Sequence, residues 1–372
     1  MKFAKWLMLV ACGLVLVSLA ACGTTSSSTT GTSASASGKV NPANLKVALS
    51  LGFLNDEAGQ MELAGYKASF KEFGITHYTV VNAEYNAATQ SQQLQAIVQS
   101  KPDVIFMTPS DPVGTKVAVQ QATAAGIPVF VSDGWMDGAG LTGGSVLDNL
   151  LGGEWSMATL IKSMGGKGNI GLVELASNLN WNERDLGAKY VLSLYPNVHV
   201  VQDWQWDSTG VITPTMAIDN MMRAEPKGKL DGIWCAWDGG VQAGLVATKA
   251  AGRTEIKFVG FDGGTQALQL LATNPQFVGT VGPATYNMAH TAVSLAMQYL
   301  NGQKLSPQPE YIQLAALTPD VVKNATVPAG AKSIDYGMPG GMAKFGYPVI
   351  TQDLLKSMVP ELSIPSPSTS AQ

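Results

Sequence analysis

This chain of 372 residues carries little charge: only 13% of its residues are Asp, Glu, Lys or Arg, and the formal net charge is -4. No run of Lys and Arg occurs in it. Because a nucleic-acid binder needs a concentrated basic surface to neutralise phosphates, this composition argues against nucleic acid as a partner. With 46% hydrophobic residues, the chain is long enough for two packed domains.

Cysteine is also scarce, and none of the three cysteines is placed for an intramolecular disulfide. Cys12 lies in an apolar segment that we expect to be removed, and Cys22 directly follows that segment. Cys235 then remains alone within "DGIWCAW", which is typical of a buried strand. We predict a fold without disulfides and a buried, unreactive thiol at Cys235.

Signatures of enzymes are missing or weak. The three histidines have no metal-ligand spacing, and neither the phosphate-loop nor the nucleophile-elbow pattern occurs. The segment "GKGNIG" (166–171) has the glycines of a dinucleotide loop, but it follows a predicted helix and precedes a predicted strand, the reverse of the required order. Paired carboxylates could serve a glycosidase only at a defined separation. We therefore predict no catalytic residue, no metal, no cofactor and no enzyme activity.

The start of the chain predicts export and lipid anchoring. The apolar run over 6–20 has about 15 residues, which is short for a membrane-spanning helix of roughly 20. It ends in "LAAC" (19–22), which resembles the cleavage site of bacterial lipoproteins. We expect a signal peptide over 1–21, a lipid on Cys22 and a flexible tether over 22–43 that is rich in Ser and Thr. The mature protein would lie outside the cytoplasm, held at a membrane.

From residue 45 onward, short apolar runs alternate with longer helical patterns. Examples are "LKVALSL" (45–51), "DVIFM" (103–107) and "IPVFV" (127–131), followed later by "NIGLVE" (169–174) and "KFVGF" (257–261). Runs that are apolar at nearly every position fit strands covered on both faces, and their alternation with helices indicates parallel sheets. The pattern predicts an α/β fold with two similar Rossmann-like lobes.

Acidic side chains and tryptophans recur just after the predicted strands. Open α/β sheets bind ligands beyond the carboxyl ends of their strands, so these turns are candidates for a site. An aspartate there often only caps the next helix, and for Asp111, Asp238 or Asp262 taken singly, capping is the better explanation. The turns are "FLND" (53–56), "TPSD" (108–111), "SDGW" (132–135), "WQWD" (204–207), "AWDGG" (236–240) and "FDGG" (261–264).

Tryptophans at strand ends and in loops shift the balance toward ligand binding. The C–H face of a sugar packs flat on an aromatic ring, and a carboxylate accepts hydrogen bonds from neighbouring hydroxyls. A small uncharged sugar or polyol is therefore the expected ligand. A small cation is the alternative, because indole faces and carboxylates also form a cage for an ammonium group. The tryptophans concerned are Trp135, Trp181, Trp206 and Trp237.

Several segments together resemble the ribose-binding-protein-like family, which comprises type 1 periplasmic binding proteins that serve ABC transporters. The resemblance covers about 45 to 320 and implies two lobes joined by a three-strand hinge, which close on a ligand and do no chemistry. The segments are "DVIFMTPSDPVGTKVAVQQATAAGIPVFVSD" (103–133), "LDNLLGGEWSMATLI" (147–161), "NERDLGA" (182–188), "WDGGVQAG" (237–244), "FVGFDGG" (258–264) and "GTVGPATYNMA" (279–289).

The resemblance also implies how the chain is divided. The N-terminal lobe takes 44–145 and 283–307, the C-terminal lobe takes 146–282 and 308–362, and a disordered tail takes 363–372. A monomer that delivers its ligand to an ABC transporter permease is implied, and a chemosensory receptor is the alternative. A sugar-responsive repressor shares these lobes, but an export signal stands where its DNA-binding module would be.

Carried over position by position, the ligand contacts of that family fall on seven residues here. Gly134 and Asn182 occupy places where the ribose-type receptor has arginines, so the cleft is expected to be poor in arginine. Arg184 is expected to be structural, which disfavours an anionic ligand. The seven residues are Asp56, Thr108, Asp133, Asn182, Trp206, Trp237 and Asp262.

Individual roles follow from this assignment. We expect Trp206 and Trp237 to hold the ligand ring between them, and Trp135 and Trp181 to cover the entrance of the cleft. Asp238 is expected to cap the next helix or to reach the ligand.

Overall fold

The computed structural model describes residues 39–174, 179–207, 210–282, 284–325 and 332–362. The expected signal peptide, Cys22, most of the tether and the expected tail lie outside these residues. Pro283, which the family resemblance places at a crossover between the lobes, lies outside them as well. The described residues, from Lys39 onward, belong to one compact unit. In the part of the chain that is described, no helix combines the length and apolar character needed to cross a membrane.

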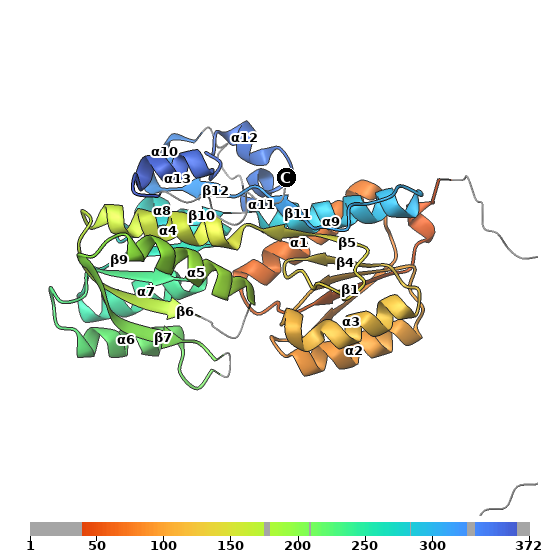
Figure 1. Ribbon diagram of the computed structural model, residues 1–372, viewed down its shortest axis with the longest axis horizontal. Helices are drawn as coiled ribbons and strands as arrows, with labels where there is room; N and C mark the ends of the chain where they lie inside the picture. Colours follow the sequence, from red (N-terminus) through yellow and green to blue (C-terminus); the bar gives the residue numbers. More distant parts are fainter. Residues whose placement is uncertain (1–38, 175–178, 208–209, 283, 326–331, 363–372) are drawn as a thin grey trace, which may run out of the picture. The chain divides into compact units, whose positions relative to one another are not determined.

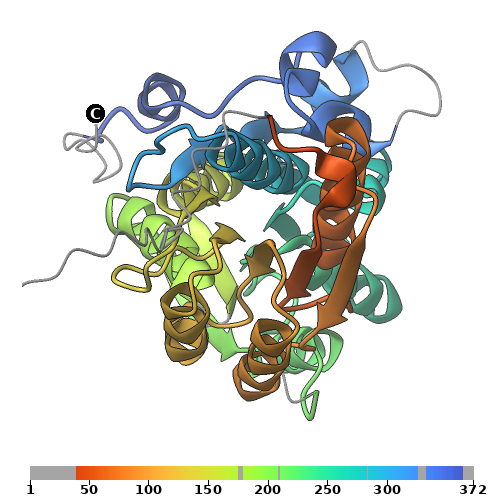
Figure 2. The ribbon, with the colours of Figure 1, turned by 90° about the vertical axis from the view of Figure 1, so that its right-hand side faces the viewer.

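The first sheet has six strands in the order β11-β5-β4-β3-β1-β2, all paired in parallel. Helices α1 and α9 pack together on one face, and α2 and α3 on the other (Figures 1 and 2). The strands are β1 (Val47–Leu51), β2 (Tyr78–Asn82), β3 (Val104–Thr108), β4 (Val129–Ser132), β5 (Gly143–Leu147) and β11 (Glu310–Ile312). The helices are α1 (Glu57–Phe73), α2 (Ala87–Gln99), α3 (Pro112–Ala124) and α9 (Thr285–Leu300).

Alternation along the strands explains why both faces of this sheet are covered. Leu49 and Phe106 belong to the hydrophobic cluster shared with α1 and α9, whereas Ala48 and Ile105 belong to the cluster shared with α2 and α3. Successive side chains of a strand point to opposite faces, so an uninterrupted apolar strand fills two cores. The sequence pattern predicted this arrangement, and the structure confirms it.

The second sheet repeats the plan in the order β12-β10-β9-β8-β6-β7. Its strands are parallel except β12, which runs antiparallel to β10. The strands are β6 (Gly168–Glu174), β7 (Val198–Gln205), β8 (Gly232–Cys235), β9 (Lys257–Phe261), β10 (Phe277–Gly282) and β12 (Ala315–Leu317). The helices are α4 (Asn149–Ser163), α5 (Leu179–Ser193), α6 (Pro214–Ala224), α7 (Asp238–Ala251) and α8 (Thr265–Thr273). Cys235 on β8 is a buried free thiol, as predicted.

The chain passes between the two sheets at three places: from β5 into α4, from β10 into α9 and from β11 to β12. We call each sheet with the helices packed on it a lobe. Because β11 pairs with β5, the chain leaves the first sheet after residue 312, later than the expected boundary at residue 308. The remaining lobe boundaries stay a prediction.

After β12 the described residues form short helices, α10 to α13, that pack mainly on the second lobe (Figure 1). Contacts link α10 to α8 and α13 to α4, while α11 also contacts α1 and α9 of the first lobe. This C-terminal segment is therefore an integral part of the fold. Its helices are α10 (Pro319–Asn324), α11 (Ser333–Gly337), α12 (Gly341–Phe345) and α13 (Gln352–Met358).

Candidate ligand-binding site

The two sheets end in a matching pair of turns. Asp133 follows β4 and Asp262 follows β9, which occupy equivalent positions in the two strand orders. Both aspartates have positive φ angles, 61° and 123°, and each is followed by a glycine with positive φ, Gly134 and Gly263. Such backbone angles are uncommon outside glycine and concentrate at functional sites. The same strained turn therefore presents a carboxylate from each lobe.

A small cavity lies where these turns meet, and both lobes contribute to its wall. Its volume is ≈ 20 Å³, enough for little more than one water molecule, so a larger ligand must separate the lobes to enter. The lining residues are Phe53, Asp56, Ala58, Glu62, Tyr85, Asp133, Leu147, Trp181, Arg184, Asp262, Thr285 and Met288.

Asp133 has the clearest mark of a ligand contact. Its side chain is only 8% exposed, and its Oδ1 has no hydrogen-bond partner in the described part of the chain. Burial raises the pKa of this carboxyl, although the charge of Arg184 acts in the opposite direction. A buried acceptor without a donor is costly, and a hydroxyl or an ammonium group in the cavity would satisfy it.

Arg184 and Asp262 form the opposite wall. The Arg184 Nη1 lies 3.5 Å from Asp262 Oδ1 and donates to the carbonyl of Ala236 at 2.8 Å, while its Nε donates to Asn149 Oδ1 at 2.9 Å. The guanidinium also covers the Phe261 ring at 3.6 Å. Burial raises the pKa of Asp262 to about 7, and Arg184 opposes this rise. Arg184 was expected to be structural only, yet it lines the cavity.

Asp56 is fixed by two donors at the start of α1. It is the N-cap of that helix and accepts from the backbone N–H of Gly59 at 2.9 Å. Tyr85 donates its hydroxyl to the other carboxylate oxygen. The Tyr85 ring stacks on Phe53 at 4.9 Å and meets the edge of Trp206, from the second lobe, at 5.5 Å. Asp56 thus lies in the cavity wall with its orientation set by Tyr85.

The tryptophans of the second lobe stack on one another, which overturns the expected sandwich. The ring centroids of Trp206 and Trp237 are 5.4 Å apart with an interplanar angle of 18°, and Trp181 and Trp237 are 4.7 Å apart. A ring between two indoles would need about 7 Å, because each stacked contact takes roughly 3.5 Å. Only Trp181 of these three lines the cavity. The cluster forms one aromatic wall.

Glu62 forms the floor of the cavity in the first lobe. It accepts a hydrogen bond from Ser132, whose hydroxyl also pairs with Tyr66 at 2.6 Å and with Thr108 at 3.1 Å. Burial, reinforced by the charge of Asp133, raises the pKa of Glu62 to about 8. Thr108, a predicted contact, lies behind this floor and outside the lining. Thr108 therefore supports Glu62 through Ser132.

Asp238 differs most from its expected role. It is 2% exposed, and both carboxylate oxygens have protein donors: the backbone N–H of Gly263 at 2.7 Å and the hydroxyl of Thr280 at 2.7 Å. It is the first residue of α7, whose N-cap is Trp237. Burial, then the charge of Asp262, raises the pKa of Asp238. Asp238 thus neither caps a helix nor faces the cavity, and instead holds the turn that carries Asp262.

Two predicted residues lie beside the cavity. Trp135 donates its indole N–H to Asp137 at 2.9 Å and lines a neighbouring groove of ≈ 270 Å³. Asn182 is half-buried in the first part of α5 and does not belong to the cavity lining. Their contribution to binding stays a prediction.

Sequence reasoning missed Glu62, Tyr85 and Phe53. Glu62 shares an apolar helix face with Tyr66 and Phe70 at four-residue spacing, which is a detectable sign of a buried carboxylate. Tyr85 follows β2 just as Trp206 follows β7, the equivalent strand. Comparing the turns of the two lobes pairwise would have found it.

Comparison with known proteins agrees with this geometry. The family model for the periplasmic binding protein domain matches residues 47–304. The D-apiose import binding protein of Actinobacillus succinogenes is 26% identical over 243 residues, covering 64% of this chain and 76% of the relative. The xylitol-binding protein of Mycolicibacterium smegmatis is 26% identical over 252 residues, covering 65% and 68%.

Solved structures show the same fold. An ABC transporter solute-binding protein from Actinobacillus succinogenes with bound D-allose matches with a TM-score of 0.68 and 22% identity, over 75% of this chain and 99% of that one. One from Agrobacterium vitis with bound allitol matches with a TM-score of 0.69 and 23% identity, over 75% and 97%.

Proposed function

Because this chain belongs to the periplasmic binding protein family, we propose that it is an extracytoplasmic receptor that captures a small sugar or polyol between its lobes for an ABC importer. The family consists of solute-binding proteins. The relatives with known ligands bind sugars and polyols, and the cavity here is bounded by acceptor groups and aromatic rings. No catalysis is proposed.

The observation that carries the proposal is the buried, unpartnered Oδ1 of Asp133, which faces Asp262 and Arg184 of the other lobe across one cavity. A polyol hydroxyl can donate to Asp133 and accept from a guanidinium, and its C–H face can rest on Trp181. Only the closed arrangement offers all these groups together. A ligand that contacts both lobes therefore shifts the hinge equilibrium toward closure.

A titration tests this assignment. We expect a thermal-shift screen with xylitol, allitol, D-apiose and D-allose to identify a ligand, whose affinity is then measured by calorimetry. Asp262→Ala is expected to weaken ligand binding by about 2 kcal/mol, because the ligand hydroxyl and Arg184 lose their shared acceptor. Asp219→Ala, on an exposed part of α6, serves as the control. Unchanged affinity in Asp262→Ala would remove that residue from the site.

The charges in the cavity support a second candidate, a small cationic ligand. Four acidic side chains line the cavity (Asp56, Glu62, Asp133 and Asp262), whereas Arg184 is the sole cation among the lining residues and already faces Asp262. A buried charge needs a partner, and an ammonium group would supply it. Small amines therefore belong in the same screen, and stabilisation by an amine alone would favour this candidate.

Anchoring by a lipid on Cys22 is part of the proposal and rests on the sequence. Membrane fractionation of the full chain tests it: the wild-type protein is expected with the membranes and Cys22→Ala in the soluble fraction. Affinity capture from membranes of the host with ligand present distinguishes a permease partner from a chemoreceptor.

A further inference from the structure

Helix α8 of the second lobe begins without a side-chain cap of its own. Its N-cap is Gly264, which has no side chain to accept from the first N–H groups of the helix. The first N–H groups of a helix lack intrahelical acceptors, and the aligned peptide dipoles place partial positive charge there. The start of α8 immediately follows the turn of Asp262, at the edge of the cavity.

A carboxylate from the first lobe takes this place. Glu57, the first residue of α1, accepts from the backbone N–H of Gln266 at 2.9 Å through Oε1. Its Oε2 accepts from the side-chain amide of Gln242 on α7 at 3.3 Å. One side chain of the first lobe thus binds two helices of the second lobe.

The close approach of the Glu57 carboxylate explains why residue 264 is a glycine. The backbone of Gly264 has φ −65° and ψ 169°, angles that any residue adopts, so its conformation does not require glycine. A Cβ built on Gly264, however, would lie 2.2 Å from the carboxyl carbon of Glu57. The missing side chain leaves the room that the carboxylate occupies.

The contact between Glu57 and the start of α8 lies next to two residues that line the cavity. Asp56, which lines the cavity, directly precedes Glu57, and Asp262, which also lines it, lies two residues before Gly264. The bond between Glu57 and Gln266 forms only when these two turns approach each other. On the assumption of the proposed receptor function, we infer that Glu57 is a positioning residue: it caps α8 across the cleft and thereby stabilises the closed arrangement that holds the ligand.

Two measurements on the full chain test the inference. Hydrogen exchange without ligand is expected to be faster in Glu57→Ala at the amides of 265–268, and also in peptides around Tyr85, which contacts Trp206 elsewhere along the cleft. Calorimetry with xylitol and allitol is expected to give a dissociation constant raised about tenfold. A purely local cap would change exchange at 265–268 alone. The matched control is Glu72→Ala on the same helix, where the carboxylate is exposed and pairs with His290.

Gly264→Ala sharpens the test, because it leaves Glu57 in place and blocks its approach. It is expected to weaken binding about as much as Glu57→Ala, and the double variant is expected to be no weaker than either single one. Additive losses, or unchanged exchange near Tyr85, would overturn the inference. If neither polyol binds the wild type, the receptor proposal fails for these ligands, whereas the exchange measurement still decides the role of Glu57.

Discussion

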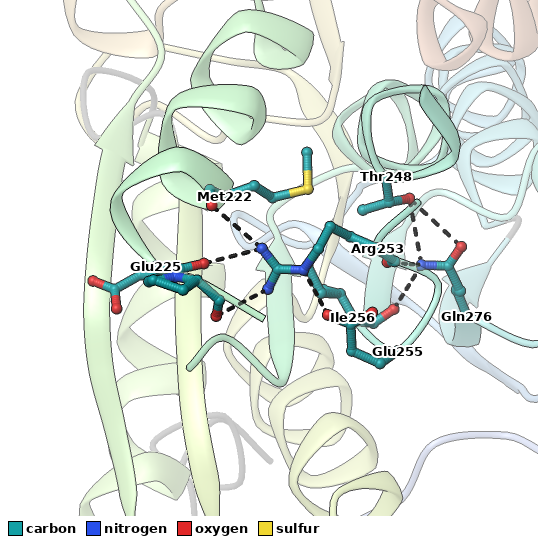
Figure 3. Close-up of polar contacts among 8 residues, drawn as sticks. Met222, Glu225, Thr248, Arg253, Glu255, Ile256 and Gln276 are labelled. Carbon is teal, nitrogen blue, oxygen red and sulfur yellow. Dashed lines mark hydrogen bonds and ion pairs between the residues drawn. The ribbon is translucent and has the colours of Figure 1, made fainter. Parts of the chain in front are cut away.

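Two buried arginines of the second lobe lie in contrasting surroundings. Arg253, 8% exposed, has a partner for every guanidinium nitrogen: the carbonyls of Met222, Glu225 and Pro226, and the carboxylate of Glu255 (Figure 3). Arg184, 4% exposed, lies beside Asp262 and a cavity in which Asp133 Oδ1 has no donor. Among the described residues, each arginine lies near a carboxylate with one unmatched buried oxygen, Glu255 Oε2 for Arg253 and Asp133 Oδ1 for Arg184. The difference is that Asp133 lines a cavity to which both lobes contribute, whereas Arg253 and Glu255 belong to the second lobe alone.

The backbone shows the same contrast. The turns of Asp133 and Asp262 hold non-glycine residues at positive φ, as does Tyr85, whereas Arg253 and its partners have no such angle. Evolved proteins satisfy nearly all buried polar groups, and they tolerate strain and unmatched acceptors where a ligand completes the structure. The comparison indicates that Arg253 and its partners stabilise the fold of the second lobe, whereas the surroundings of Arg184 are suited to binding a ligand.

Replacing Arg253 should lower the stability of the fold without changing the affinity for the ligand. Arg253→Met removes the guanidinium donors of the Met222 and Glu225 carbonyls and of the Glu255 carboxylate, so the free energy of unfolding is expected to fall by about 4 kcal/mol. The Pro226 carbonyl still accepts from the backbone N–H of Lys229. Urea denaturation measures this change, and ligand affinity below the transition should match the wild type. Arg223→Met, in an exposed ion pair on α6, should cost well under 1 kcal/mol. A loss of ligand affinity in folded Arg253→Met would contradict this separation between residues that stabilise the fold and residues that bind the ligand.

Glu62 should reveal the cavity through the pH dependence of stability. Its pKa is raised from 4.5 to about 8, so the folded protein holds a proton that the unfolded chain releases. Stability from this group is complete below pH 4.5 and is lost as the pH rises through 8, on the order of 4 kcal/mol between pH 5 and pH 8.5. Glu62→Gln keeps a neutral side chain and should flatten this loss.

Urea denaturation at pH 5 and pH 8.5 makes the comparison. The free energy of unfolding of Glu62→Gln, relative to that of the wild type, should be higher at pH 8.5 than at pH 5. Glu310→Gln, at an exposed position of β11, should show the same pH dependence as the wild type. An equal difference at both pH values would mean that Glu62 is ionised in the folded protein.

The framework was far easier to predict from sequence than the site. Apolar runs such as 103–107 specify their own strands, because a strand that is buried on both faces needs apolar residues at every position. Asp133 and Asp262, which were predicted as ligand contacts from their places after strands, both line the cavity, since parallel strands bring their carboxyl ends to one edge. Their role in binding stays a prediction.

The errors concern contacts that depend on side-chain direction and on pairing between lobes. Stacking of Trp206 on Trp237 and the inward turn of Asp238 follow from packing, which spacing along the chain does not encode. Glu57 meets Gln266 across 209 positions of sequence. Single-residue signals carry no information on such distant pairs.

The C-terminal segment offers the smallest and most local test of the framework. Ser333, fully buried on α11, pairs its hydroxyl with Tyr286 of α9 at 2.6 Å and with Thr265 of α8 at 2.8 Å. It thereby joins the start of α8 to a helix of the first lobe, although it lies beyond the family match at 47–304. Ser333→Ala is expected to lower the free energy of unfolding by about 1 kcal/mol.

A control within the same segment separates this link from a general effect of losing a hydroxyl. Ser357 on α13 is exposed, and its hydroxyl donates to the carbonyl of Leu354 within the same helix, so Ser357→Ala should cost about a few tenths of a kcal/mol, as surface changes do. Urea denaturation compares the two variants, and hydrogen exchange at Thr265 locates the difference. Equal stability losses in both variants would show that the Ser333 hydroxyl does not hold the start of α8.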